Sequence, residues 1–200
     1  MRLLQLFSLL VAILLLLMVT SCRSQNSDES ALRDEFEIPS TAKVVSFKVH
    51  PEKPGGFGRE GLKIDIAFQL SADSFRQYAA RATASGKWKP LPIPELFLRR
   101  MAAIETSKRS RIQSYRMRGE KLPPEGSVYN PTEQQMLNSF INSLPLQPDN
   151  GLFQVRVAGT DIMRTPKSLY ETPDRDLNDF MLAMLDNHRK QIIIKVSTSY

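Results

Sequence analysis

Residues 62–70, LKIDIAFQL, alternate between large apolar side chains and residues that are mostly polar. The apolar set consists of Leu62, Ile64, Ile66, Phe68 and Leu70. A repeat of two residues places one set of side chains on a single face of a β-strand. This segment therefore has to lie in a sheet with a buried face, which constrains the fold more than any other stretch of the chain.

A second strand is predicted at residues 44–49, where Val45, Phe47 and Val49 alternate with more polar residues. The stretch between the two strands, HPEKPGGFGREG, is rich in Pro and Gly and predicts a loop. The two strands are therefore expected to pair as an antiparallel hairpin.

Residues 72–85 are expected to form a helix, with Ser71 as its N-cap and Gly86 as its stop. Its buried stripe follows the spacing i, i+3, i+4, i+7 and consists of Phe75, Tyr78, Ala79 and Ala82. A second helix is expected from Pro94 to about Lys108. Residues 109–129 have little periodicity and are expected to be mostly loop.

A third helix has the clearest start signal. Asn130 is the predicted N-cap, Pro131 occupies the first helical position, and Glu133 can reach back to complete a capping box. Pro145 is expected to end this helix.

Two further strands are predicted at 152–158 and 191–199. Residues 179–186, DFMLAMLD, are ambiguous, because their composition favours a helix whereas Asp186-Asn187-His188 can turn directly into the last strand. We prefer the strand. The predicted fold is α+β, with an antiparallel sheet of four or five strands and two or three helices packed on one face.

The amino terminus has the pattern of an export signal. Arg2 is followed by an uninterrupted apolar run at 9–19, which is eleven residues long. A membrane span needs roughly 20 residues, whereas the core of a signal peptide has about 7–15. Val19-Thr20-Ser21-Cys22 follows, and Cys22 is the only cysteine of the chain.

This stretch resembles the lipobox of bacterial lipoproteins, which combines a branched apolar residue, two small residues and a cysteine. The resemblance implies that the chain is cut before Cys22, whose thiol then carries a diacylglyceryl group. The residue after the cysteine is Arg23 rather than aspartate, which in a Gram-negative cell implies the outer membrane, facing the periplasm. A conventional secretory signal or an uncleaved anchor is the alternative.

The predicted organisation is a signal peptide at 1–21, a flexible tether at 22–39 and a single α+β domain at 40–200. The tether is assigned because the residues after Cys22 are polar and charged. With Cys22 acylated, the mature domain has no thiol, so it offers no disulfide, cysteine zinc site or cysteine nucleophile.

No catalytic motif, metal site or cofactor is predicted. His50 and His188 are far apart and neither has a companion at metal-ligand spacing. PGGFGREG is followed by a strand rather than by the helix N-terminus that a phosphate loop requires. An acidic group could perform acid–base chemistry if it were buried, but a solvated loop or a helix N-terminus is the simpler interpretation. Its members are Glu171, Asp174, Asp176 and Asp179.

The strongest charge feature is a basic segment between residues 99 and 121. It contains Arg99, Arg100, Lys108, Arg109, Arg111, Arg116, Arg118 and Lys121. Only Glu105 and Glu120 oppose these cations, so the local excess of six equals the formal net charge of the whole chain. Such a segment gains about 1 kcal/mol per residue near an anionic membrane. The predicted contact residues are Arg109, Arg111, Arg116 and Arg118, and the alternative is a solvated basic face.

Trp88 opens the segment WKPLPIP, in which three prolines impose an extended backbone. This single tryptophan is either an exposed anchor for a partner or a side chain that holds the segment against the core.

These features predict a lipid-anchored, non-enzymatic protein of the cell envelope that binds a protein or an anionic envelope component. The export signal argues against a nucleic-acid partner. Two alternatives stay open. One is an envelope hydrolase or other enzyme with an unrecognised acidic or Ser/His site, and the other is an immunity or inhibitor lipoprotein that blocks an incoming toxin.

Overall fold

The computed structural model describes residues 28–51, 62–144, 149–157, 160–161, 176–177 and 179–198. The chain divides into two compact units, Met1–Ala42 and Lys43–Tyr200. In the first unit, residues 28–35 form a helix within the stretch that the sequence predicts to be a flexible tether. The Arg33 guanidinium stabilises this local structure, because it bonds to Glu29 at 2.8 Å and to the carbonyls of Pro39 and Ala42 at 3.0 and 2.8 Å.

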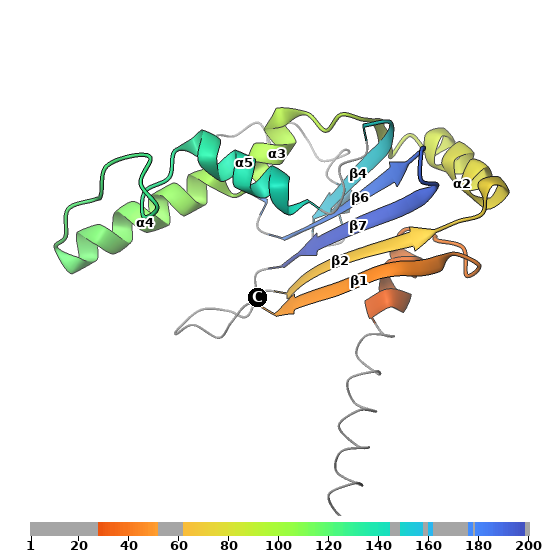
Figure 1. The fold of residues 1–200 in the computed structure, drawn as a ribbon, viewed down its shortest axis with the longest axis horizontal. Coiled ribbons are helices and arrows are strands. Elements are labelled where there is room, and N and C mark those ends of the chain that lie inside the picture. The colour runs from red at the N-terminus through yellow and green to blue at the C-terminus, as the bar shows by residue number, and fades with distance from the viewer. Residues whose placement is uncertain are drawn as a thin grey trace, which may run out of the picture. The chain divides into compact units, whose positions relative to one another are not determined.

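The second unit is built on one open antiparallel sheet (Figure 1). Its strands are β1 (Lys43–Pro51), β2 (Leu62–Gln69), β3 (Lys89–Pro90), β4 (Gly151–Val157), β5 (Thr160–Asp161), β6 (Phe180–Asp186) and β7 (Gln191–Ser197). The spatial order is β1-β2-β7-β6-β4-β3, and β5 pairs with β4 outside this path. The predicted β1–β2 hairpin and the β6–β7 hairpin are both confirmed.

The α+β class and the antiparallel sheet are confirmed, but the predicted count of four or five strands is wrong. Six strands lie along the path of the sheet. The strand that the sequence does not reveal is β3, which has only two residues and exists because Lys89 and Pro90 lie opposite Phe153 and Leu152 of β4. A strand this short has no periodicity of its own, so its pairing partner defines it.

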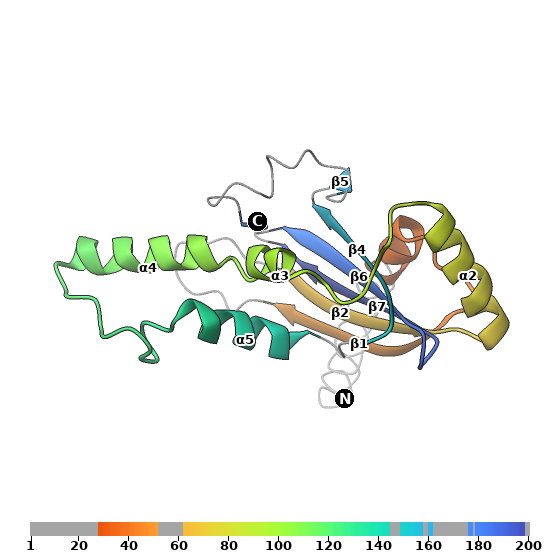
Figure 2. The same ribbon diagram turned by 90° about the horizontal axis from the view of Figure 1, so that it is seen from above.

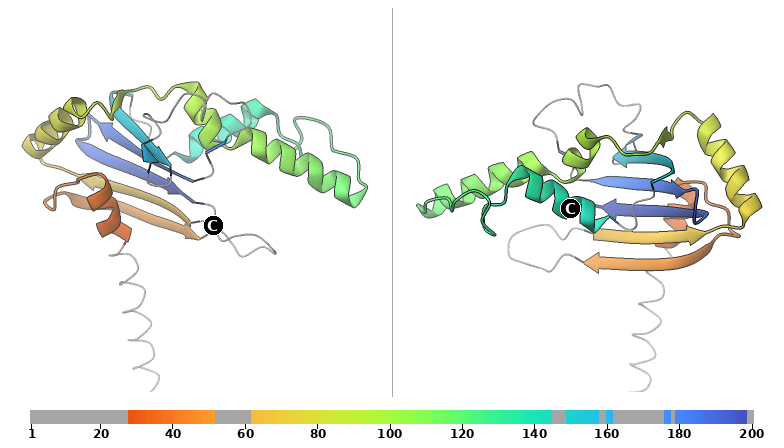
Figure 3. Two further views of the ribbon diagram at one scale, coloured as in Figure 1. Left: turned by 180° about the vertical axis from the view of Figure 1, so that it is seen from behind. Right: turned by 45° about the horizontal axis from the view of Figure 1, so that its top comes forward.

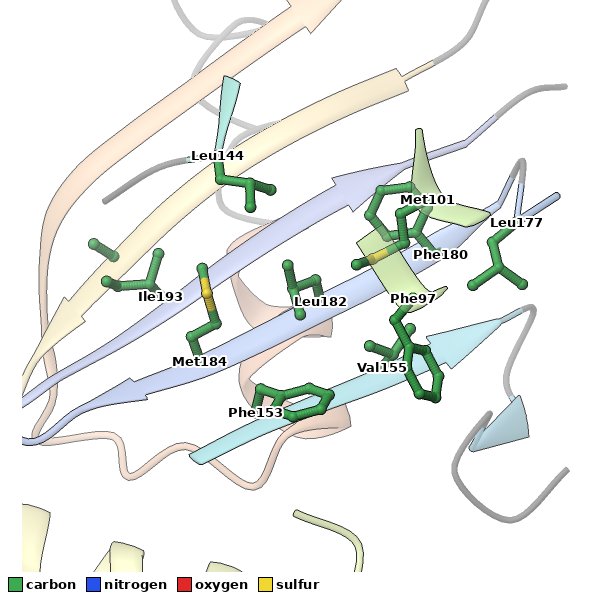
Figure 4. Packing of buried hydrophobic residues seen from close by; sticks show 11 residues of the cluster. Phe97, Met101, Leu144, Phe153, Val155, Leu177, Phe180, Leu182, Met184 and Ile193 are labelled. Carbon is green, nitrogen blue, oxygen red and sulfur yellow. The ribbon is translucent and has the colours of Figure 1, made fainter. Parts of the chain in front are cut away.

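The middle of the sheet is buried on both faces, which explains why residues 179–186 were ambiguous. One face presents Phe153 of β4, Leu182 and Met184 of β6, and Ile193 of β7 to the cluster in Figure 4. The opposite face includes Ile194 beside Ile66 of β2, and both of these side chains are also buried. A strand with two buried faces reads as a continuous apolar run rather than an alternating one.

The described residues of the second unit form four helices rather than the two or three expected. They are α2 (Ala72–Ala84), α3 (Glu95–Met101), α4 (Ile104–Arg118) and α5 (Glu133–Ser143). The predicted helix from Pro94 to Lys108 is divided at Ala103, whose φ of +50° lies in the left-handed region. Residues 109–118, expected as loop, continue α4, so that prediction is wrong.

The predicted cap of the last helix is also wrong. Thr132 is the N-cap of α5, and its hydroxyl and the Gln135 side chain form the two halves of a capping box. Asn130 lies outside the helix, and its side-chain amide donates to the carbonyl of Pro123 at 2.7 Å.

Helices α3 and α5 cover one face of the sheet. Phe97 of α3 meets Phe153 edge to face at 6.3 Å between ring centroids, and Phe140 of α5 meets Phe180 in the same way at 6.2 Å. In both views of Figure 3, α4 extends past the end of the sheet instead of lying over it. Within the described part of the chain, no helix is long and apolar enough to span a bilayer.

Candidate binding surface on the α4 arm

Helix α4, the connection 119–132 and α5 form an arm, residues 104–143, whose outer part extends beyond the sheet (Figure 2). Of the fifteen residues of α4, only Ile104 is buried. A helix that is polar on all sides receives little stability from packing, so its ends and its side-chain pairs have to maintain it.

The two ends of α4 are well stabilised. At the N-terminus, the carboxylate of Asp176 accepts from the backbone N–H of Thr106 at 2.6 Å, where a negative charge also complements the helix dipole. At the C-terminus, Gly119 adopts a left-handed conformation with φ of +67°, and Arg116 and Arg118 lie in the last turn. The helix is therefore built to persist without a buried face.

Two cations of the basic segment, Arg99 and Lys108, pair with carboxylates at the base of the arm. Glu133, the first residue of α5, accepts from Arg99 of α3 and from Lys108 of α4, the latter at 3.0 Å. Arg99 also lies 3.7 Å from Glu95. The hydrogen bond from Lys108, followed by that from Arg99, lowers the pKa of Glu133, and the same hydrogen bond to Glu133 raises the pKa of Lys108.

This clustering changes the charge of the segment. Glu133 and Glu95 come from outside residues 99–121, so the excess of six counted along the sequence overstates the local field. Arg99 and Lys108 instead connect α3, α4 and α5.

The four predicted contact arginines do not share one environment. Arg109 and Arg116 have exposed side chains and lie seven residues apart, on the same face of α4. Arg118 pairs with Glu120 at 2.9 Å and its guanidinium lies over the Tyr115 ring at 4.6 Å. Arg111 is half-buried and points at Met136 of α5, so its role is to pack the arm.

Sequence reasoning missed the apolar residues of the arm. Met117 is 73% exposed, and Val128 and Tyr129 of the connection are 91% and 72% exposed. The sequence does contain a sign of this exposure. Residues 109–129 include apolar side chains, but these lack the regular spacing that would place them on one buried face.

Trp88 is half-buried, and its ring meets Tyr78 of α2 edge to face at 6.2 Å between centroids. Tyr78 is itself buried. This geometry matches the alternative in which Trp88 holds the segment 88–94 against the domain.

A pocket of about 550 Å³ lies at the base of the arm, between α3, α5 and the sheet. Its nearly buried Lys195 donates to Asp65 at 3.2 Å and to the carbonyl of Ser143, at the end of α5, at 3.3 Å. A cation is favourable at a helix C-terminus. These contacts attach α5 to strands β2 and β7, which gives the polar groups of the pocket a structural role.

The structure describes only part of the acidic group and of the histidine positions that the sequence analysis considered. In the acidic group, Asp176 caps α4 as described, whereas Glu171 and Asp174 lie outside the described residues. No three potential metal ligands gather among the residues that the structure describes. His188, in the β6–β7 turn, lies 3.4 Å from Asp149, and both side chains are exposed. Cys22, PGGFGREG and the side chain of His50 are outside the described part.

No protein family, curated protein or solved structure matches this chain.

Proposed function

We propose that this chain is a lipid-anchored envelope protein that acts as a non-enzymatic binding module, with the α4 arm as its contact surface. The lipobox-like stretch ending at Cys22 supports the anchor, and Arg23 supports the outer membrane facing the periplasm. The ligand would be a protein or an anionic envelope component.

The observation that carries the proposal is a helix that contributes almost nothing to the core and yet is capped at both ends. Only Ile104 of α4 is buried, while Asp176 and Gly119 stabilise its termini. Folding alone does not require such a helix to extend beyond the sheet. Its exposed face carries Arg109 and Arg116, which suit an anionic partner.

The test is a matched pair of charge reversals in the full-length, membrane-extracted chain. Arg109→Glu with Arg116→Glu alters the arm, and Arg76→Glu with Arg81→Glu alters exposed arginines of α2. Each pair changes the formal net charge from +6 by four units to +2. We measure how much solubilised envelope material the immobilised chain retains as salt is raised from about 0.05 M to about 0.5 M, which shortens the range of charge interactions.

The proposal predicts that salt weakens retention by the unaltered chain, that the arm pair reduces it strongly, and that the α2 pair leaves it nearly unchanged. Equal effects of the two pairs would show that only net charge matters, and would refute a contact at the arm. The intact mass of the same preparation reports the anchor. It should show cleavage before Cys22 with added acyl groups, which Cys22→Ser should abolish. An unmodified Cys22 joined to residues 1–21 would disprove the anchor.

A further inference from the structure

In the part of the chain that the structure describes, the exposed large apolar side chains are concentrated in the outer arm, residues 112–130. Among the described residues, eight large apolar side chains are exposed, and five of them lie here. They are Ile112, Met117, Leu122, Val128 and Tyr129. Single exposed apolar residues are normal on a protein surface, but a local concentration of them indicates an interaction site.

Val128 and Tyr129 are presented by an ordered turn beside the N-terminus of α5, where the Gln135 side chain donates to the carbonyl of Gly126 at 3.3 Å. They occupy the two central positions of the turn, and the backbone N–H of Asn130 closes it by donating to the carbonyl of Ser127 at 3.0 Å. Asn130 is buried and its side chain donates to Pro123, while the Gly126 N–H donates to the Asn130 carbonyl at 2.7 Å. The exposure of the two side chains therefore follows from a hydrogen-bonded backbone rather than from a frayed loop.

Cations accompany these apolar residues. Arg116 and Arg118 flank Met117 in the last turn of α4, and Lys121 adjoins Leu122. The acids of this segment are Glu120, which pairs with Arg118 at 2.9 Å, and the exposed Glu125, so residues 112–130 carry a formal excess of one positive charge. Apolar and tyrosine side chains next to cations match the two layers of an anionic bilayer surface, where acyl chains lie just beneath charged headgroups.

The composition of the segment favours a bilayer over a protein partner. A fluid surface accepts apolar and tyrosine side chains without a complementary pocket, and its anionic headgroups attract the neighbouring cations.

We infer that the outer arm is a membrane-contact element, in which Val128, Tyr129 and Met117 enter the interface of an anionic bilayer while Arg116 and Lys121 contact its headgroups. This inference rests on the proposed function and names the anionic component as lipid. An acyl anchor at Cys22 would fix only one point of the molecule, and the arm would add a second contact that sets the orientation of the domain.

The experiment uses the full-length, acylated chain reconstituted into vesicles. Val128→Cys then supplies the only free thiol, because Cys22 is the single natural cysteine and its sulfur is occupied by lipid. An environment-sensitive fluorophore on this thiol is followed in phosphatidylcholine vesicles and in vesicles enriched in phosphatidylglycerol, with a quencher attached to the acyl chains. Ala80→Cys, at an exposed position of α2, is the matched control, and Met117→Cys is a second arm site.

The inference predicts quenching and a blue shift at positions 128 and 117 in the anionic vesicles, with neither change at position 80. Adding Arg116→Gln should lower the ratio of inserted to free arm about fivefold, the equivalent of about 1 kcal/mol for one cation. Absence of quenching at both arm positions, or equal quenching at position 80, would overturn the inference. If quenching is absent while the charge reversals still reduce retention of envelope material, the arm binds a non-lipid component and the proposed function survives. If both results are negative, both proposals fail.

Discussion

Glu133 is the residue on which the base of the arm depends. Its carboxylate accepts from Arg99 and Lys108 and so connects three helices. Because these hydrogen bonds lower its pKa, the ionised form is stabilised in the folded chain. A lowered pKa contributes stability that is present above the ordinary value of 4.5 and is lost as the pH falls through the lowered value.

We predict that Glu133→Gln lowers the free energy of unfolding by about 0.5–1 kcal/mol at neutral pH. The figure is small because these side chains are partly exposed and solvent screens their pairing. The difference from the unaltered chain should shrink at acid pH and vanish once Glu133 is protonated in both states. Urea unfolding of both chains at neutral pH and near pH 3 measures this difference in the free energy of unfolding. The control is Asp73→Asn, which removes an exposed ion pair with Arg76. A difference that persists unchanged at low pH would contradict this account.

Single residues also explain one failure of sequence reasoning. Asn130 and Thr132 are both good N-cap residues two positions apart, and the sequence cannot choose between them. In the structure Thr132 forms the capping box with Gln135, and the amide of Asn130 donates to the carbonyl of Pro123, seven residues earlier. A loop contact of this kind leaves no periodic signal in the sequence.

At the scale of elements, the break between α3 and α4 depends on Ala103. It holds a left-handed backbone with φ of +50°, whereas its neighbour Ala102 has an ordinary helical φ of −73°. The left-handed conformation costs an L-residue roughly 1–2 kcal/mol, and glycine does not incur this cost. Helix propensity alone does not predict a break at two adjacent alanines, which are strong helix formers.

We predict effects of opposite sign at these two positions. Ala103→Gly should stabilise the chain by about 0.5–1 kcal/mol, since relief of the strained backbone exceeds the added entropy of the unfolded chain. Ala102→Gly should destabilise it by about 0.5–1 kcal/mol. Thermal unfolding of both variants compares them directly. Destabilisation by Ala103→Gly would show that the left-handed turn is not the origin of the break.

Helix α4 shows which elements pattern reasoning finds and which it misses. Helix α2 was predicted with its cap and its buried stripe, because Phe75, Tyr78 and Ala82 pack on the domain. The sequence predicts a loop at residues 109–118 because the periodic signal of a helix comes from fully buried side chains, and this part of α4 has none. The exposure of Met117 and Tyr129 was missed for the same reason.

At the scale of the whole molecule, the sequence predicts the antiparallel sheet and its two principal hairpins. The two-residue strands β3 and β5 could not be predicted, since each is defined only by its pairing with β4. The sequence also does not predict the local charge of the arm. Glu133 and Glu95 lie outside residues 99–121 and come close to Arg99 and Lys108 only in the folded chain.

The central claim is that this molecule meets its ligand through the arm. In-cell photo-cross-linking tests it most directly, with a photoreactive residue placed at Gln113 of α4 in the anchored chain and at Gln77 of α2 as the matched position. Both glutamines are exposed, and Gln113 lies between Arg109 and Arg116 on the same face of α4. We expect one reproducible adduct, to lipid or to an envelope component, from position 113, and no shared adduct from position 77. The same adducts at both positions, or none at position 113, would contradict the claim.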